Sequence, residues 1–220
     1  MTLPDNALPP PPVLRYLALG DSYTIGEGVT GSGRWPVQLA SALRNRGIGL
    51  ADPQIIATTG WTTDELLAGI EAGAPQGPFD LVSLLIGVNN QYRGRALDDY
   101  REQFELLLQR AIALAGGNPR RVLVLSIPDW GVTPFAAAQA RAAATIASEL
   151  DAFNATARAC CEQRHVAFVD ITGISRDRGS EAEMLVEDGL HPSAAMYARW
   201  TRAALAPARH LLTAAATAAP

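Results

Sequence analysis

The sequence contains no lysine, and all 18 of its basic residues are arginines. A chain without lysine cannot form a lysine Schiff base, and it lacks the lysine of a phosphate-binding loop and of a serine–lysine dyad. Acidic residues outnumber basic ones, and the formal net charge is −4. Because no basic stripe is present to neutralise a phosphate backbone, we expect no nucleic-acid partner.

Cysteine is scarce, and the only two copies are adjacent, at Cys160 and Cys161. This spacing indicates neither a disulfide framework nor a zinc site. Long apolar runs are also missing, since none approaches the about 18 residues that a membrane span needs. Residues 1–12 hold five prolines and one acid, without the basic and apolar segments of a secretory signal. We therefore expect a cytoplasmic protein without stable membrane insertion.

What the sequence does contain is an alternation of strand and helix patterns, repeated five times. Apolar runs predict strands at residues 13–19, 54–58, 79–86, 121–127 and 166–170. Periodic apolar positions and capping signals predict helices at about 35–47, from a capping box at 62–65 onward, and at about 98–115, 137–164 and 193–210. The pattern predicts one α/β domain at residues 13–210, with three layers and a five-stranded, mostly parallel sheet. We expect residues 1–12 to form an extended lead-in, 171–192 an irregular connection and 211–220 a flexible tail.

Several candidate functional residues share one position relative to the predicted strands. Ser22 follows the first strand, after Gly20 and Asp21, while Gly60 and Asn89 follow the second and third. Open α/β sheets bind their ligands in the crevice beyond the carboxyl ends of the strands. A serine after a strand is by itself typical of a turn or helix cap, but the shared edge indicates a site.

Near the end of the chain, Asp188 and His191 lie three residues apart. A carboxylate at this spacing can accept a hydrogen bond from one imidazole nitrogen and leave the other free to take a proton from a hydroxyl. Acyl transfer also requires donors for a developing oxyanion, which a loop glycine N–H at Gly60 and the side-chain amide of Asn89 can supply. The alternative for Asp188 and His191 is a loop stabilised by local hydrogen bonds.

Four segments of the sequence resemble the conserved blocks of the SGNH hydrolases, also called the GDSL esterase/lipase family. They are Gly20-Asp21-Ser22, Thr59-Gly60-Trp61, Gly87-Val88-Asn89-Asn90 and Asp188 to His191. The blocks occur in the family's order from residue 20 to 191, which is most of the chain. Two positions depart from the family pattern: Asn90 stands where the family usually has aspartate, and Tyr23-Thr24-Ile25 follows the serine where the family name expects leucine.

The resemblance implies a flavodoxin-like SGNH hydrolase fold and a serine esterase that needs no metal or organic cofactor. It implies Ser22 as the nucleophile, His191 as the general base and Asp188 as the residue that orients His191. The oxyanion hole would consist of the Ser22 and Gly60 backbone N–H groups and the Asn89 side chain. We expect a small or short-acyl ester substrate, since no large apolar insertion offers a lipid groove. Candidate residues of the substrate pocket are Tyr92, Arg93 and Trp130.

Other functions share parts of this pattern. An acyltransferase or a carbohydrate O-deacetylase would use the same residues, and a binding module on a hydrolase fold would usually lack the serine or histidine. Residues 26–31 read G-x-G-x-x-G, but five residues separate the motif from the strand, which argues against a dinucleotide site. The G-x-S-x-G elbow of the α/β-hydrolases is absent, because Thr24 occupies its last position. Nothing in the pattern indicates an oligomeric state.

Overall fold

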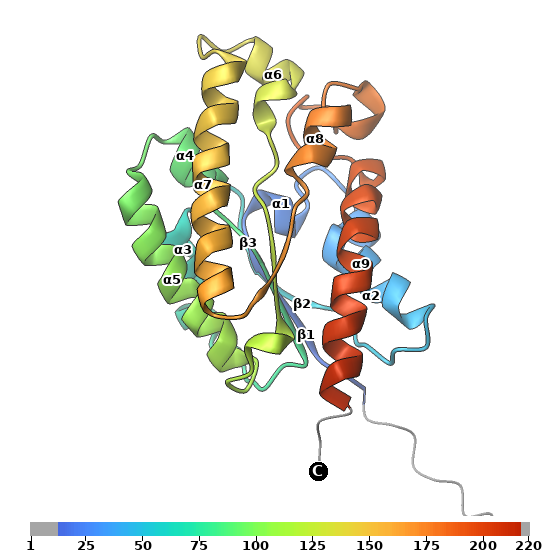
Figure 1. Ribbon diagram of the computed structural model, residues 1–220. Coiled ribbons are helices and arrows are strands. Elements are labelled where there is room, and N and C mark those ends of the chain that lie inside the picture. Colours follow the sequence, from blue (N-terminus) through green and yellow to red (C-terminus); the bar gives the residue numbers. More distant parts are fainter. Residues whose placement is uncertain (1–12, 217–220) are drawn as a thin grey trace, which may run out of the picture.

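The computed structural model describes residues 13–216 and contains one parallel sheet. Its strands are β1 (Tyr16–Gly20), β2 (Gln54–Ala57), β3 (Leu81–Leu85), β4 (Val122–Leu125) and β5 (Ala167–Val169), in the order β2-β1-β3-β4-β5 (Figure 1). Every adjacent pair runs parallel. This confirms the predicted fold class. The lead-in expected at 1–12 and the tail residues 217–220 lie outside the described residues.

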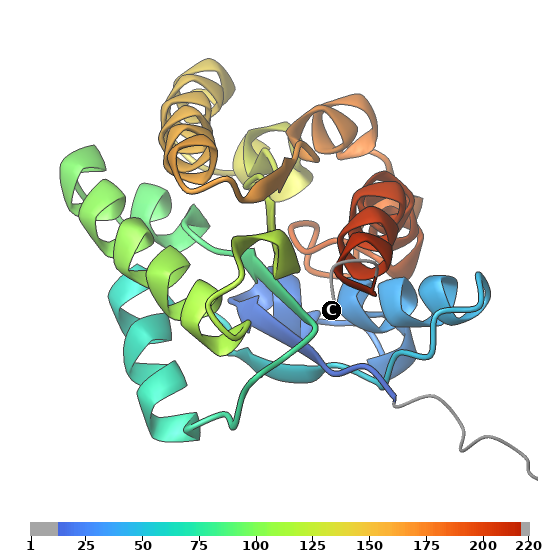
Figure 2. The same ribbon diagram turned by 60° about the horizontal axis from the view of Figure 1, so that its bottom comes forward.

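Helices cover both faces of the sheet. Helices α2 (Trp35–Arg44) and α9 (Ala194–Ala216) pack together on one face (Figure 2). The opposite face carries α3 (Thr63–Gly73), α5 (Leu97–Leu114) and α7 (Ala143–Gln163). The result is the three-layer arrangement that the strand–helix alternation predicts.

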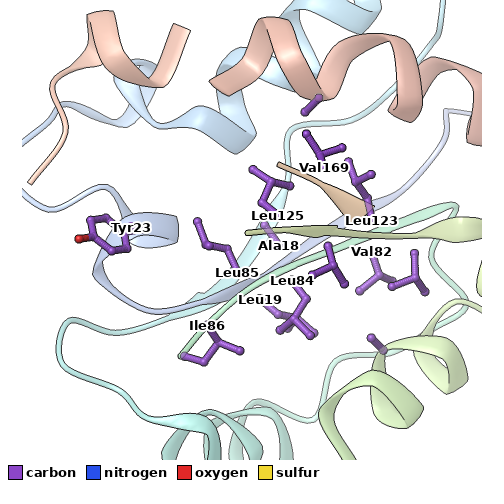
Figure 3. Close-up of a cluster of buried hydrophobic side chains, with 14 of the residues drawn as sticks. Ala18, Leu19, Tyr23, Val82, Leu84, Leu85, Ile86, Leu123, Leu125 and Val169 are labelled. Carbon is purple, nitrogen blue, oxygen red and sulfur yellow. The ribbon is translucent and has the colours of Figure 1, made fainter. Parts of the chain in front are cut away.

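Strands β1, β3 and β4 are mainly apolar, as expected of strands that are covered on both faces. All residues of β1, β3 and β4 are buried, and their side chains meet those of β5 in the core (Figure 3). One polar pair lies inside this core, where the hydroxyl of Tyr16 on β1 is 2.9 Å from that of Ser83 on β3. Each hydroxyl satisfies the other in a place where an unpaired polar group would be costly.

The structure differs from the sequence prediction in two segments. The helix expected at about 137–164 begins later, as α7 at Ala143, and a separate short helix, α6 (Pro134–Ala137), precedes it with Thr133 as its N-cap. The connection expected to be irregular contains α8 (Thr172–Arg178). The N–H and hydroxyl of Thr172 both donate to Ser126 Oγ, which is a long-range contact that has no local sequence signal.

The last helix is also longer than expected. It begins after Ser193, whose hydroxyl accepts from the N–H of Met196 at 3.4 Å, and it continues past His210 to Ala216. Leu211 and Leu212 are buried, so packing against the rest of the domain extends the helix into the segment that was predicted to be flexible. Within residues 13–216, no helix is both long and apolar enough to cross a bilayer.

Short helical segments complete the fold. The two that follow β1 and β3 are α1 (Ser22–Ile25) and α4 (Val88–Tyr92). Single 3₁₀ turns occur at Gly31–Gly33, Pro119–Arg121, Trp130–Val132 and Ala182–Met184. Helices α1 and α4 begin at the carboxyl ends of their strands, and they position the candidate site.

Candidate active site

Ser22 is the first residue of α1, directly beyond the end of β1. Asp21 caps this short helix, since its Oδ1 accepts from the N–H of Tyr23 at 3.0 Å. Only glycine fits at the end of the strand, because a Cβ at Gly20 would overlap Thr24 and the carbonyl oxygen of Leu85 on β3. As a first-turn group, the N–H of Ser22 has no intrahelical acceptor, and none of the described residues accepts its hydrogen. That N–H is therefore free to donate to a ligand.

Asp21 is a buried acid beside the candidate nucleophile. It is 1% exposed, and its second carboxyl oxygen, Oδ2, has no hydrogen-bond partner within residues 13–216. Burial in a low-dielectric environment disfavours the charged form, and this desolvation raises the pKa of Asp21 to about 7. The Asp21 side chain stabilises the start of α1 as its N-cap, and this role is separate from that of Asp188.

Asp188 and His191 form a close pair in the loop before α9. Asp188 Oδ2 lies 2.6 Å from His191 Nδ1, while Asp188 Oδ1 accepts from the backbone N–H groups of Leu190 and His191 at 2.8 and 2.9 Å. Partial burial opposes ionisation of Asp188, but these hydrogen bonds outweigh it and lower the pKa of the carboxyl. An ionised carboxylate at Nδ1 keeps the proton on that nitrogen and leaves Nε2 as the acceptor.

His191 and Ser22 come from opposite ends of the chain and line the same pocket. The imidazole packs against the ring of Tyr23, the residue after Ser22, with ring centroids 6.0 Å apart in an edge-to-face arrangement. No hydrogen bond joins Ser22 Oγ to His191 within the described part of the chain. Nucleophile–base contacts are often longer before substrate binds, and both side chains line the same pocket.

Two further donors face this pocket from the ends of β2 and β3. Gly60 lies in a turn closed by the N–H of Trp61 donating to the carbonyl of Thr58 at 3.2 Å. Its φ of +87° favours glycine, and its own N–H has no acceptor among residues 13–216. Asn89, in the first turn of α4, donates one side-chain N–H to the carbonyl of Trp61 at 2.8 Å. Its second amide hydrogen has no acceptor in the described part of the chain.

Asn90, which replaces the family's usual aspartate, is fully buried, and both the oxygen and the nitrogen of its amide are hydrogen-bonded. Its Oδ1 accepts from the backbone N–H of Thr63 at 3.1 Å, and its Nδ2 donates to the hydroxyl of Thr63 at 2.7 Å. The same hydroxyl donates to Gln103. Because an amide both accepts and donates, Asn90 completes a hydrogen-bond chain that ties α4 to the start of α3.

The pocket measures about 190 Å³ and is mainly apolar. Of the residues predicted for the site, the structure brings together Ser22, Gly60, Tyr92, Asn89, Trp130 and His191 as lining residues. Asp188 contacts His191, as described above. Arg93 does not line the pocket, because its guanidinium instead contacts the carbonyl of Gly60 and the carboxylate of Glu65.

Sequence reasoning missed part of the lining. The additional residues are Tyr23, Thr59, Val88, Phe135 and Leu190. Four of these are next to predicted residues in the sequence, so adjacency could have indicated them. Phe135 had no such signal, because its position depends on the unexpected start of α6. Its ring lies 6.2 Å from that of Trp130, which in turn lies 5.4 Å from that of Tyr92, so three aromatic side chains form one wall.

Within residues 13–216, no group of three or more His, Cys, Asp or Glu side chains is arranged to hold a metal ion. Cys160 and Cys161 are buried on α7 with raised thiol pKa values, chiefly because of desolvation. The residues that line the pocket include Ser22, His191 and Asn89, together with Gly60 and further hydroxyl-bearing residues at Thr59, Tyr23 and Tyr92.

The sequence also matches a known protein family. A model of the GDSL-like Lipase/Acylhydrolase family matches residues 18–199, and the chain belongs to that family. A search of curated proteins found no match.

Solved structures of this fold include several related hydrolases. TesA is 22% identical, with a TM-score of 0.70 over 90% of this chain and 99% of that one. Axe2, an acetylxylan esterase from Geobacillus stearothermophilus, is 19% identical, with a TM-score of 0.68 over 89% and 94%. EstA is a psychrotrophic esterase from Pseudoalteromonas sp., solved in a form inhibited by monoethylphosphonate. It is 15% identical, with a TM-score of 0.63 over 92% of this chain and 96% of that one. At these identities the likeness establishes the fold.

Proposed function

We propose that this protein is a serine esterase that hydrolyses small carboxylic esters through a covalent acyl-serine intermediate. The observation that carries the proposal is the position of the Asp188–His191 pair. This pair brings an imidazole, whose Nε2 has no hydrogen-bond partner among residues 13–216, to the same pocket as Ser22 and as the donors at Gly60 and Asn89.

In this mechanism, Ser22 Oγ attacks the ester carbonyl carbon while His191 Nε2 takes the hydroxyl proton. The carbonyl oxygen becomes an oxyanion, which accepts hydrogen bonds from the N–H groups of Ser22 and Gly60 and from the amide of Asn89. The C–O bond then breaks, and His191 gives the proton to the leaving alcohol. Water next attacks the acyl-serine with His191 again as the base, and the acid product leaves with Ser22 restored.

The substrate class follows from the size and lining of the pocket. A volume of about 190 Å³ with Tyr92, Trp130 and Phe135 on one wall favours a short acyl or a flat aryl group over a long lipid chain. The similarity to Axe2 favours a second candidate, removal of acetyl groups from carbohydrate, by the same residues. Transfer of the acyl group to an alcohol instead of water would also use this site.

A panel of p-nitrophenyl acyl esters and acetylated sugars tests the proposal, with product analysis in the presence of competing alcohols. Ser22→Ala is expected to abolish hydrolysis, and Asn89→Ala to lower kcat by about 10²- to 10³-fold, as for loss of one oxyanion donor. Covalent labelling of Ser22 by an alkyl phosphonate, followed by mass spectrometry, provides a measurement independent of turnover. Undiminished hydrolysis by Ser22→Ala, or no hydrolysis of any ester by the wild type, would contradict the proposal.

A further inference from the structure

The turn that carries Gly60 is held in place by side chains from other parts of the chain. The hydroxyl of Thr59 donates to the carboxylate of Glu27, in the loop after α1. Gly60 itself has no side chain, so its carbonyl oxygen is the group through which it can be held. That oxygen accepts from Arg93 Nη2 at 2.7 Å.

Arg93 also binds the helix that begins directly after the turn. Its Nη1 lies 3.2 Å from Glu65 Oε1 in the first turn of α3. Glu65 Oε2 in turn accepts from the backbone N–H of Thr62 at 2.8 Å, which closes the capping box of α3. One guanidinium therefore bridges the carbonyl of Gly60 and the helix start that follows it. Because Arg93 ends α4, it also links the turn to the helix that carries Asn89.

We propose, resting on the esterase function above, that Arg93 is a positioning residue that fixes the direction of the Gly60 N–H toward the oxyanion. Glycine adopts many backbone conformations that other residues do not, so the turn needs an external restraint at this point. The Gly60 N–H belongs to the Thr59–Gly60 peptide unit, and Arg93 holds the next unit, Gly60–Trp61, through its carbonyl oxygen. Because the bond from Thr59 to Glu27 holds the residue before Gly60, Arg93 restrains the remaining rotation about the Gly60 backbone and thereby the direction of its N–H. A hydrogen bond weakens steeply as its angle departs from linearity, and a rotated Gly60 N–H would stabilise the oxyanion poorly.

The contacts of Arg93 argue against a role in binding an anionic part of the substrate. The guanidinium is already bonded to Gly60 and Glu65, and it does not line the pocket. A restraint on an oxyanion donor acts in the transition state, where the negative charge develops, and much less in the ground state. The loss of Arg93 should therefore lower kcat and leave KM nearly unchanged.

The chain provides a matched control for this residue. Arg95 also pairs with the first turn of α3, with its Nη1 2.7 Å from Asp64 Oδ1, but it makes no hydrogen bond to residues 58–61. Arg93→Ala and Arg95→Ala each remove one partly exposed arginine and one ion pair from the same helix start. Only the first removes a contact to the turn.

The test compares these two variants on the best ester of the panel. Arg93→Ala is expected to lower kcat by about 10-fold or more, below the full loss of an oxyanion donor, and to change KM by less than about threefold. The rate of covalent labelling by an alkyl phosphonate should fall in parallel. Arg95→Ala should stay within about twofold of the wild type on each measure, and Arg93→Lys should recover part of the lost rate.

A measurement that does not depend on turnover accompanies the kinetics. The ¹⁵N order parameter of the Gly60 amide is expected to fall in Arg93→Ala and to stay unchanged in Arg95→Ala. Equal behaviour of the two variants in kcat and in the Gly60 amide would overturn the proposal, as would a rise in KM confined to anionic esters. Failure of the esterase function itself is recognised separately, by a wild type that hydrolyses no ester or by an active Ser22→Ala variant.

Discussion

At the scale of single residues, the two carboxylates near Ser22 have opposite electrostatic environments. Asp188 accepts hydrogen bonds from the His191 ring and from two backbone N–H groups, which lower its pKa. Asp21 is buried with one oxygen unpartnered in the described residues, and desolvation raises its pKa to about 7. The ionised acid is the one that can orient and stabilise an imidazolium, so Asp188 fits that role and Asp21 does not.

The raised pKa of Asp21 predicts a stability effect that depends on pH. An unfolded aspartate titrates near about 3.9, so between about pH 4 and 7 the folded protein binds more protons at this position than the unfolded chain. Linkage then requires the contribution of Asp21 to the free energy of unfolding to fall as pH rises through about 7, by an amount of the order of a few kcal/mol.

Urea denaturation of the wild type and of Asp21→Asn at several pH values measures this contribution. Asparagine keeps an acceptor for the Tyr23 N–H but does not titrate. The wild-type free energy of unfolding, taken relative to the variant, should decrease from pH 4 to 7 and level off above that range. A difference that stays constant from pH 4 to 8 would show that Asp21 is not held in this environment.

At the scale of the elements, two buried tyrosine hydroxyls differ in whether they have a hydrogen-bond partner. The Tyr16 hydroxyl on β1 is bonded to Ser83 on β3. The hydroxyl of Tyr197 on α9 is equally buried and has no partner within residues 13–216. A paired buried hydroxyl stabilises the fold, whereas an unpaired one carries a desolvation penalty.

This contrast predicts different outcomes for the same substitution at two places. Tyr16→Phe should lower the free energy of unfolding by about 1–3 kcal/mol, because it leaves the Ser83 hydroxyl unsatisfied. Tyr197→Phe should be neutral or stabilising, because it removes a group without a partner. Thermal and urea unfolding of both variants, with Ser83→Ala and the Tyr16→Phe/Ser83→Ala pair to complete a double-mutant cycle, measures the difference. Equal losses at the two tyrosines would contradict this interpretation.

At the scale of the whole molecule, α9 joins the candidate site to the core. Trp200 is fully buried on this helix and packs edge-to-face against Tyr197 at 5.0 Å and against Tyr23 at 5.9 Å. Tyr23 follows the candidate nucleophile and touches His191. Helix α9, near the end of the chain, thus supports a site whose candidate nucleophile lies directly beyond the first strand.

Trp200→Ala should therefore destabilise the whole domain. Truncation of a buried tryptophan costs about 3–5 kcal/mol, which is a large share of the about 5–15 kcal/mol that typical domains have. Urea unfolding followed by circular dichroism should show a lower midpoint. Leu106→Ala on α5 is the control, because Leu106 is 53% exposed and should change stability by less than about 0.5 kcal/mol. Similar midpoints for the two variants would contradict the importance of this packing.

How far the sequence predicts the structure depends on whether the signal is local. The strands, the Thr62–Glu65 capping box and the helix at 98–115 follow from apolar periodicity and short-range hydrogen bonds, and they occur close to the expected bounds. Helices α6 and α8 also make contacts to residues far away in the chain, from the Phe135 N–H to the carbonyl of Gly189 and from Thr172 to Ser126. An alanine-rich segment has high helix propensity throughout, so it carries little local information about where a helix stops.

The candidate site divides in the same way. Asp188 and His191 are three residues apart, and their hydrogen bond is a local property of the loop, so the sequence by itself determined this pair. The sequence also determined which residues follow each strand, and therefore which side chains reach the carboxyl edge of the sheet. Only the tertiary structure decided how these edges meet around one pocket and that Phe135 contributes to its wall. The tertiary structure also shows that Arg93, predicted as a pocket residue, instead binds Gly60. The sequence could not indicate this, because the two acceptors of the Arg93 guanidinium, on Glu65 and Gly60, lie 28 and 33 positions away in the chain.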